Sequence, residues 1–326
     1  MRDPSLTMLW EPVDARAALS HRFGLDSAAA AGAHVAAAVA DHWDLRTTCE
    51  RVVLSDQNLL AWVHGDGRTF VVKACAAEPS FARLAAVADV VALLGSQGLP
   101  VAAPLPALDG SHRVVVDGPV RLSVFVMPLV VGRSLDPRDA TAVRATGVAL
   151  ARMHRALAGI DVELPGPVPP AVAGVADPRP VRALPDGAPG RTRAPRAAAR
   201  LDALLADLPD LDVTPTLLHG DVRGANVLIA DGGAAVLLDH DTMGLGHRVL
   251  DLARGAATIA TQFRAWDPPP PGARRHLVDG YREAAPLTPV EERWLEAALL
   301  AEGLRHVPAG DDPTGWAAAV ERDVDA

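Results

Sequence analysis

Three polar side chains between residues 219 and 241 have the types and the spacing that phosphoryl transfer requires. The stretch H-G-D-V-R-G-A-N-V-L begins at His219 and places Asp221 five residues before Asn226, and the following L-L-D-H-D supplies Asp239. A carboxylate can accept the proton of an attacking hydroxyl group, so Asp221 is the candidate general base. Amide and carboxylate oxygens are the ligands that Mg²⁺ prefers, so Asn226 and Asp239 are the candidate metal ligands.

The same residues also have an ordinary structural explanation. Gly, Asp and Asn are common in turns, so His-Gly-Asp could mark only a turn and Asn226 could only cap a strand. The elements nevertheless occur in order, and a predicted hairpin separates Asn226 from Asp239. Its strands are Val227 to Ala230 and Ala234 to Leu238, and its Asp-Gly-Gly turn is typical of hairpins. We interpret the three side chains as one site.

These motifs resemble the catalytic loop of the aminoglycoside phosphotransferase and choline kinase family, in which His-Gly-Asp is followed by four residues and Asn. The resemblance covers about residues 50–253 and ends at Asp251-Leu252-Ala253. It implies a protein-kinase-like site that uses ATP, or GTP, with Mg²⁺. His219 would hold the loop without moving protons. Arg223 could stabilise charge on the transferred phosphoryl group, or it could be a surface arginine.

The order of the predicted elements agrees with this resemblance. We expect an α+β, two-lobe, protein-kinase-like fold: an N-terminal nucleotide-binding lobe over residues 1–128, with five antiparallel strands and a leading helix, and a mostly helical C-terminal lobe over residues 129–326. Helices are predicted at 27–43, 79–95, 139–157, 197–208, 251–265, 274–284 and 289–307, and strands at 50–54, 59–63, 69–74, 113–116 and 120–127. Residues 160–196, rich in Pro, Gly and Arg, are predicted to form an insert with little regular structure.

Lys73 lies inside an apolar predicted strand, F-V-V-K-A-C. An isolated lysine of this kind could simply extend its ammonium group to solvent. Its place on the third strand of a kinase-like lobe implies that it binds the α- and β-phosphates. The family usually supplies a glutamate on the next helix to hold this lysine, but the predicted helix contains only Asp89. We predict that Asp89 is the partner, with Glu78 as the alternative.

Two further segments of the first lobe are predicted to contact the nucleotide. The loop Ser55-Asp56-Gln57-Asn58 stands where nucleotide kinases have a glycine-rich flap, and it lacks glycine. The side chains of Ser55 and Asn58 could replace the backbone N–H groups of such a flap, or the loop could be an ordinary hairpin turn.

The segment from Phe125 to Gly132, F-V-M-P-L-V-V-G, resembles the hinge between kinase lobes. Adenine needs a carbonyl acceptor and, two residues on, an N–H donor. Pro128 can supply the carbonyl and Val130 the N–H group, with Met127 beside them, although a plain strand ending at proline fits the same residues.

Composition limits the classes of partner. The net charge of −9 argues against a nucleic-acid partner and suits a cationic small molecule. The two cysteines, Cys49 and Cys75, are too few for a disulfide framework, and no apolar run of membrane-spanning length or leader-like N-terminus is apparent. We therefore expect a cytoplasmic protein, a monomer or a homodimer, with no membrane partner.

The expected activity is transfer of the γ-phosphate of ATP, or GTP, to a hydroxyl group of an aminoglycoside-like antibiotic or an amino sugar, with Mg²⁺ as cofactor. A kinase of a primary metabolite such as choline, homoserine or a sugar is the alternative within the same chemistry. A nucleotide-binding pseudokinase, which would act through partners, is the alternative of another class.

Overall fold

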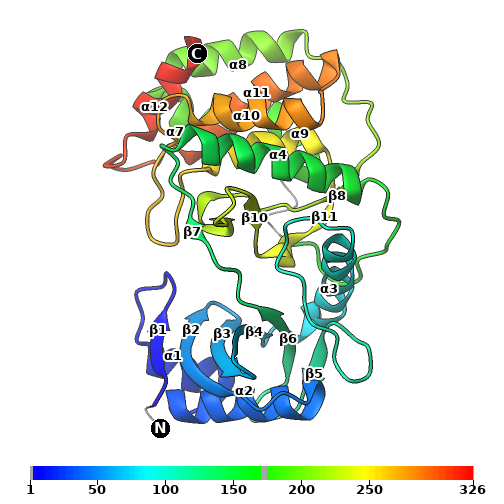
Figure 1. Ribbon diagram of the computed structural model, residues 1–326. Coiled ribbons are helices and arrows are strands. Elements are labelled where there is room, and N and C mark those ends of the chain that lie inside the picture. The colour runs from blue at the N-terminus through cyan, green and yellow to red at the C-terminus, as the bar shows by residue number, and fades with distance from the viewer. Residues whose placement is uncertain (1–2, 170–174, 326) are drawn as a thin grey trace. The chain divides into compact units, whose positions relative to one another are not determined.

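The computed structural model describes residues 3–169 and 175–325 of the 326-residue chain. The chain divides into two compact units (Figure 1). Unit 1 comprises Met1–Val130 together with Val162–Pro167, and unit 2 comprises Val131–Asp161 together with Val168–Ala326. The predicted insert is therefore shared, because residues 162–167 pack with the first unit.

Unit 1 is built on one mixed sheet of six strands in the order β1-β2-β3-β4-β6-β5. All neighbouring strands are antiparallel except β1 and β2, which pair in parallel with Ser5 opposite Arg51. The strands are β1 (Ser5–Met8), β2 (Thr48–Ser55), β3 (Asn58–Gly65), β4 (Arg68–Cys75), β5 (Val114–Val116) and β6 (Leu122–Pro128).

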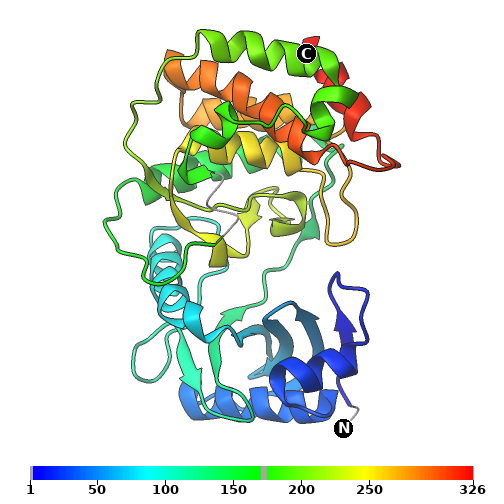
Figure 2. The same ribbon diagram turned by 180° about the vertical axis from the view of Figure 1, so that it is seen from behind.

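Helices α1 (Ala15–Phe23) and α2 (Ala28–Trp43) lie against one face of this sheet, as Figures 1 and 2 show. Each helix begins at a side-chain cap, Asp14 or Ser27, whose oxygen accepts a backbone N–H of the first turn. The core under them contains alternate strand residues, among them Leu54, Leu59 and Val72. Because successive strand residues point to opposite faces, the residues between these core positions face the other side of the sheet.

Helix α3 (Phe81–Ser96) follows a short 3₁₀ turn, η1 (Glu78–Ser80). The combined segment Glu78–Ser96 is long and apolar enough to cross a membrane by length and composition, and α1 with α2 would form a second, bent candidate. The sequence had indicated no such run. In this fold the apolar residues of α3 pack inside the protein. Eight side chains of the helix are buried, and all of them except Arg83 are apolar.

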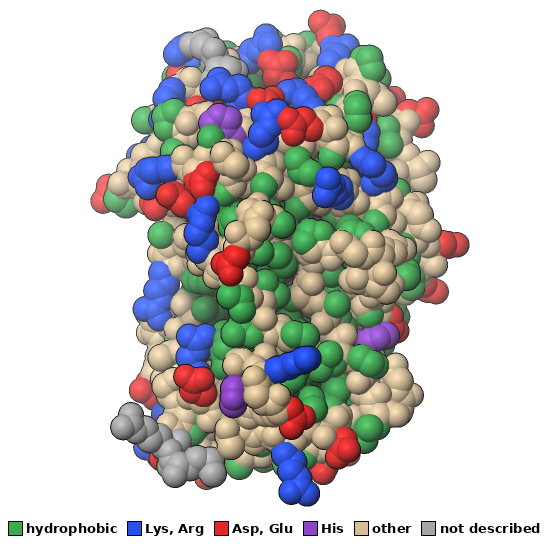
Figure 3. Space-filling model, viewed as in Figure 1, with side chains coloured by type: hydrophobic (Ala, Val, Ile, Leu, Met, Phe, Trp, Pro, Cys, Tyr) green, Lys and Arg blue, Asp and Glu red, His purple; other side chains and the backbone are tan. Residues whose placement is uncertain are grey.

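Unit 2 is mostly helical. Its helices are α4 (Ala140–Leu157), α6 (Arg179–Arg182), α7 (Pro189–Arg193), α8 (Pro195–Ala206), α9 (Arg248–Thr258), α10 (Ala273–Ala284), α11 (Pro289–His306) and α12 (Trp316–Arg322), with a final 3₁₀ turn η4 (Asp323–Asp325). Helices α4 and α10 approach closely because a Cβ at Gly147 or Gly280 would overlap a carbonyl oxygen of the other helix. On the face drawn in Figure 3, basic and acidic side chains are interspersed over these helices.

Short strands of unit 2 frame the candidate catalytic loop. Strand β8 (Thr216–Leu218) pairs with β11 (Gly244–Gly246), and β9 (Val227–Ile229) pairs with both β10 (Ala235–Leu237) and β7 (Arg133–Ser134). The 3₁₀ turns η2 (Gly224–Asn226) and η3 (His240–Thr242) carry the residues between these strands.

The predicted α+β fold class is confirmed, and several element predictions were wrong. The sheet has six strands and not five, because β1 joins it from a segment with little strand signal. The helix predicted over residues 251–265 ends at Thr258. Helices α1 and α12 were not predicted, and α6 and α7 lie in the insert that was predicted to be irregular. The part of that insert at residues 170–174 lies outside the described residues.

Candidate active site

The loop between β8 and η2 is held by backbone geometry that only certain residues permit. Gly220 has a φ of 81°, in the left-handed region that favours glycine. A Cβ at Gly224 would come within 2.5 Å of the Ile259 carbonyl oxygen, so the loop can pack there only without a side chain. Thr258 of α9 donates a hydrogen bond from its hydroxyl to the Val222 carbonyl at 3.1 Å. The loop is thus fixed against the end of α9.

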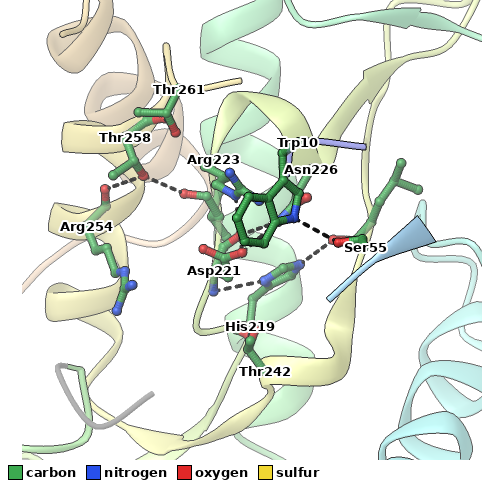
Figure 4. Close-up of polar contacts among 12 residues, drawn as sticks. Trp10, Ser55, His219, Asp221, Arg223, Asn226, Thr242, Arg254, Thr258 and Thr261 are labelled. Atoms are coloured by element: carbon green, nitrogen blue, oxygen red, sulfur yellow. Dashed lines mark hydrogen bonds and ion pairs between the residues drawn. The ribbon is translucent and has the colours of Figure 1, made fainter. Parts of the chain in front are cut away.

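Asp221 lies at the centre of this loop, beside Arg223 and Asn226 (Figure 4). The Asn226 amide donates to the Asp221 carboxylate at 3.0 Å and to its carbonyl at 2.9 Å, and Arg223 Nε lies 3.3 Å from the same carboxylate oxygen. Burial raises the pKa of Asp221, and the charge of Arg223 acts in the opposite direction without cancelling the increase. The result is a carboxylate that is oriented, largely desolvated and more basic than an ordinary aspartate.

The donor set fits a magnesium ion in one specific respect. Both side-chain hydrogen bonds of Asn226 use its amide nitrogen, so its amide oxygen can face a cation. Asp239 follows β10 in a left-handed conformation, with a φ of 61°, and its charge contributes to raising the pKa of Asp221. Residues 3–169 and 175–325 contain no cluster of three His, Cys, Asp or Glu residues suited to a metal. One carboxylate and one amide oxygen leave several positions for phosphate and water, as Mg²⁺ sites commonly do.

His219 fastens this loop to the strand that carries Asp239. Its Nε2–H donates to the Leu238 carbonyl at 2.9 Å, and its Nδ1 accepts the Asp221 backbone N–H at 3.2 Å. Thr242 donates from its hydroxyl to the His219 carbonyl at 3.0 Å. These contacts support the structural role predicted for His219. The ring of His240 packs 4.8 Å from the ring of His219.

A buried series of hydrogen-bonded side chains connects the helices of unit 2 to this loop at Gly220. The Tyr281 hydroxyl lies 2.9 Å from His154 Nδ1, and His154 Nε2 lies 3.0 Å from Asp251, which also accepts the Gly220 N–H at 3.4 Å. All three side chains are at most 2% exposed. Burial alone would raise the pKa of Asp251, but the hydrogen bonds from His154 and Gly220 leave it below its ordinary value. The sequence indicated Asp251 by family resemblance only, and it gave no signal for Tyr281.

A stack of rings ends at Arg223. Trp316 stacks on His306 with 4.7 Å between ring centroids, His306 lies 6.4 Å from Trp266, and the Arg223 guanidinium carbon lies 5.8 Å from the Trp266 ring. Trp316 also donates from its indole N–H to the Trp266 carbonyl at 2.7 Å. A cation over an indole face is attracted to it, so this stack favours one position of Arg223 beside Asp221.

In unit 1, four of the predicted nucleotide-binding residues share one face of the sheet. Lys73 lies on β4, between Leu60 and Phe125 on the neighbouring strands, and is 5% exposed. Its neighbours Val72 and Ala74 belong to the core under α1 and α2, so Lys73 faces the other side. Because core and outer positions alternate along β2, β3 and β6 as well, Ser55, Asn58 and Met127 lie on the same face as Lys73.

Asp89, the predicted partner of Lys73, contacts another residue in the structure. The buried face of α3 contains Leu84, Val87 and Val91, and Asp89 falls outside it. Its carboxylate is 66% exposed and pairs with His112 Nδ1 at 2.8 Å. Glu78, the alternative, is 54% exposed and pairs with Arg121 at 3.4 Å. The sequence showed which acids were present but could not set the rotation of the helix.

The hinge residues present the backbone groups that were predicted for adenine. Leu129 donates its N–H to the Thr69 carbonyl at 3.0 Å, on the β4 side of β6. Backbone groups alternate sides along a strand, so the Pro128 carbonyl points to the opposite edge, as the Val126 carbonyl does where it accepts from Leu105. Within the described part of the chain, the Pro128 carbonyl and the Val130 N–H have no hydrogen-bond partner.

Fold and loop geometry together define a phosphotransferase of the protein-kinase-like class. A family model described as the phosphotransferase enzyme family matches residues 54–295, and the chain belongs to that family. No curated protein sequence matches the chain.

Several solved structures share the fold. A microcompartment-associated aminopropanol kinase is 18% identical with a TM-score of 0.61, and the match covers 90% of this chain and 96% of that one. An aminoglycoside phosphotransferase from Alicyclobacillus acidocaldarius is 17% identical with a TM-score of 0.54, covering 85% and 93%. The amicoumacin kinase hAmiN, solved with AMP-PNP, Ca²⁺ and Ami, is 17% identical with a TM-score of 0.51, covering 83% and 85%. At these identities the similarity shows the fold alone.

Proposed function

We propose that this protein transfers the γ-phosphate of ATP, or of GTP, to a hydroxyl group of a small molecule, with Mg²⁺ as cofactor. Asp221 accepts the proton of the attacking hydroxyl. Asn226 and Asp239 hold the metal ion, which neutralises charge on the phosphates when it is bound. Arg223 stabilises the charge that develops on the transferred group.

One observation carries this proposal: the oriented, desolvated carboxylate of Asp221. A general base works best when its pKa lies near the working pH, and burial moves the pKa of Asp221 in that direction. The hydrogen bonds from Asn226 fix the carboxylate, so that a hydroxyl group can approach it in one orientation. A carboxylate that only capped a turn would need neither a raised pKa nor this fixed orientation.

Nucleotide contacts are assigned to the open face of unit 1. Lys73 binds the α- and β-phosphates, Ser55 and Asn58 lie on the same face, and the Pro128 carbonyl and the Val130 N–H receive adenine beside Met127. Solved relatives of the same fold were crystallised with AMP-PNP and Ca²⁺ and with ADP, which agrees with nucleotide and divalent metal binding.

The acceptor is assigned from charge. A net charge of −9 favours a cationic acceptor, so an aminoglycoside-like antibiotic or an amino sugar is our first choice. A primary metabolite, such as an amino alcohol or a sugar, is the second. We place the reaction in the cytoplasm, because Cys49 and Cys75 form no disulfide and ATP is abundant there.

The test compares two substitutions of the same kind. Asp221→Asn should lower kcat by roughly 10²- to 10⁴-fold while nucleotide affinity changes little, because a general base acts on the acceptor. Asp231→Asn, at the exposed turn between β9 and β10, is the matched control and should leave kcat unchanged. Turnover of the Asp221→Asn variant within a few fold of wild type would refute the assignment.

A nucleotide-binding pseudokinase is the alternative, and one observation favours it. Asp89, the acid predicted to hold Lys73, is exposed and paired with His112. Nucleotide binding without phosphoryl transfer to any member of an acceptor panel would support this alternative.

A further inference from the structure

The segment that precedes the family match makes a set of contacts with the turn between β2 and β3. The match begins at residue 54, so β1, α1 and α2 lie before it. We propose that Trp10, Glu11 and Arg22 are positioning residues, which lock this turn so that the Ser55 hydroxyl donates to a nucleotide phosphate. The nucleotide part of this inference rests on the proposed function, whereas the locked turn does not.

Glu11 and Arg22 hold the backbone of the turn at Asp56. The Glu11 carboxylate accepts the Asp56 N–H at 2.9 Å, and Arg22 donates to the Asp56 carbonyl at 3.0 Å. Arg22 also binds both oxygens of Glu11, at 2.6 and 2.8 Å, in a two-pronged ion pair whose side chains are only 20% and 13% exposed. Both backbone polar groups of Asp56 are therefore bound by a single, charge-neutral pair.

The turn needs support of this kind. Asp56 has a φ of 43°, a left-handed conformation that costs free energy for a residue other than glycine. Such a conformation persists only where surrounding contacts hold it. The hydrogen bonds of Glu11 and Arg22 to Asp56 are those contacts.

Trp10 sets the direction of the Ser55 hydroxyl. Its indole N–H donates to Ser55 Oγ at 2.9 Å, a contact drawn in Figure 4. An indole nitrogen can only donate, so Ser55 is the acceptor and its own hydrogen must point elsewhere. Ser55 is partly exposed and lies on the Lys73 face of the sheet, where a phosphate oxygen would accept that hydrogen.

These contacts explain how a flap without glycine can serve a nucleotide. Glycine-rich flaps bind phosphate through backbone N–H groups, but here the Asp56 N–H is already bound to Glu11. Phosphate contact then falls to the Ser55 side chain and Lys73. The negative charge of Glu11 does not oppose the phosphates, because Arg22 neutralises it.

The test pairs a structural with a functional measurement on the full-length protein. Glu11→Ala should accelerate hydrogen exchange of the Asp56 amide, followed by NMR, by roughly tenfold or more. The same variant should raise the KM for ATP about five- to tenfold, with the acceptor KM and kcat nearly unchanged. Glu11→Gln keeps an oxygen acceptor for the Asp56 N–H, so it should restore part of the exchange protection.

Two further variants separate this effect from general destabilisation. Trp10→Phe removes the indole donor but keeps an aromatic ring, and it should raise the KM for ATP roughly two- to tenfold without exposing the Asp56 amide. Arg121→Ala breaks another ion pair of unit 1, the more exposed pair with Glu78, far from the turn in the sequence. It should change neither the exchange rate nor the KM.

The outcomes are distinguishable. Unchanged exchange of the Asp56 amide in Glu11→Ala would overturn the locked turn. Faster exchange with an unchanged KM for ATP would overturn its role toward the nucleotide. Faster exchange in a protein whose wild type binds no nucleotide would leave the lock standing and refute the proposed function, and with it the assignment of Ser55.

Discussion

Tyr281→Phe is the most specific perturbation of the support behind the catalytic loop. The substitution removes one hydroxyl group and keeps the ring, so it creates little cavity. Burial raises the pKa of Tyr281 well above its usual value, and the hydroxyl therefore stays protonated and donates to His154 Nδ1. Without this donor, a nitrogen that is almost completely buried has no partner. Leaving such a group unsatisfied costs about 1–3 kcal/mol.

Thermal unfolding measures this loss directly. One kcal/mol corresponds to roughly 2–4 °C in domains of about 150–250 residues, so the transition of unit 2 should fall by roughly 2–12 °C. In a double-mutant cycle, Tyr281→Phe should cost much less stability when His154 is already alanine, so most of the loss should appear as coupling energy between the two residues. A change below about 0.5 kcal/mol, the range of ordinary surface substitutions, together with zero coupling, would refute the buried series of side chains as a support of Gly220.

Three further predictions concern the site itself. Arg223→Gln removes the positive charge that lowers the pKa of Asp221, so this pKa should rise further. Because the base must be ionised to act, the acid limb of the kcat/KM profile should move to higher pH. An unmoved acid limb would contradict the pairing of Arg223 with Asp221. Asn226→Ala and Asp239→Ala should raise the Mg²⁺ concentration needed for half-maximal activity, Asp239→Ala more because a charged ligand is lost; equal Mg²⁺ dependence to wild type would count against both. Asp89→Ala should leave activity unchanged, since its carboxylate is exposed and bound to His112, and a large loss in kcat would restore its assignment to Lys73.

The parts of the site that could be predicted from sequence are local. His219 to Asn226 and Asp239 lie within about twenty residues, joined by a hairpin whose turn is strongly coded, so motif and spacing were sufficient to bring them together. Lys73 was predicted from its place on the third strand of a kinase-like lobe, and that predicted strand is β4 of the structure.

The parts that could not be predicted depend on contacts between distant residues. The parallel pairing of Ser5 with Arg51 leaves no local pattern, and β1 was missed. The stack of Trp266, His306 and Trp316 joins residues up to fifty positions apart. The exposed position of Asp89 could not be predicted for a related reason: the rotation of α3 depends on what its apolar face packs against, which is a tertiary property.

The most direct test of the central claim is transfer of the γ-phosphate of ATP to defined acceptors, followed by mass spectrometry of the products. The panel would contain aminoglycosides, amino sugars, amino alcohols, choline and homoserine, with Mg²⁺ present or removed by a chelator, for wild type, Asp221→Asn and Asp231→Asn. We expect a singly phosphorylated product from at least one cationic acceptor. Wild type and Asp231→Asn should form it, and it should be lost both with the chelator and in Asp221→Asn. Product formation that continues in Asp221→Asn, or that needs no divalent metal, would contradict this expectation.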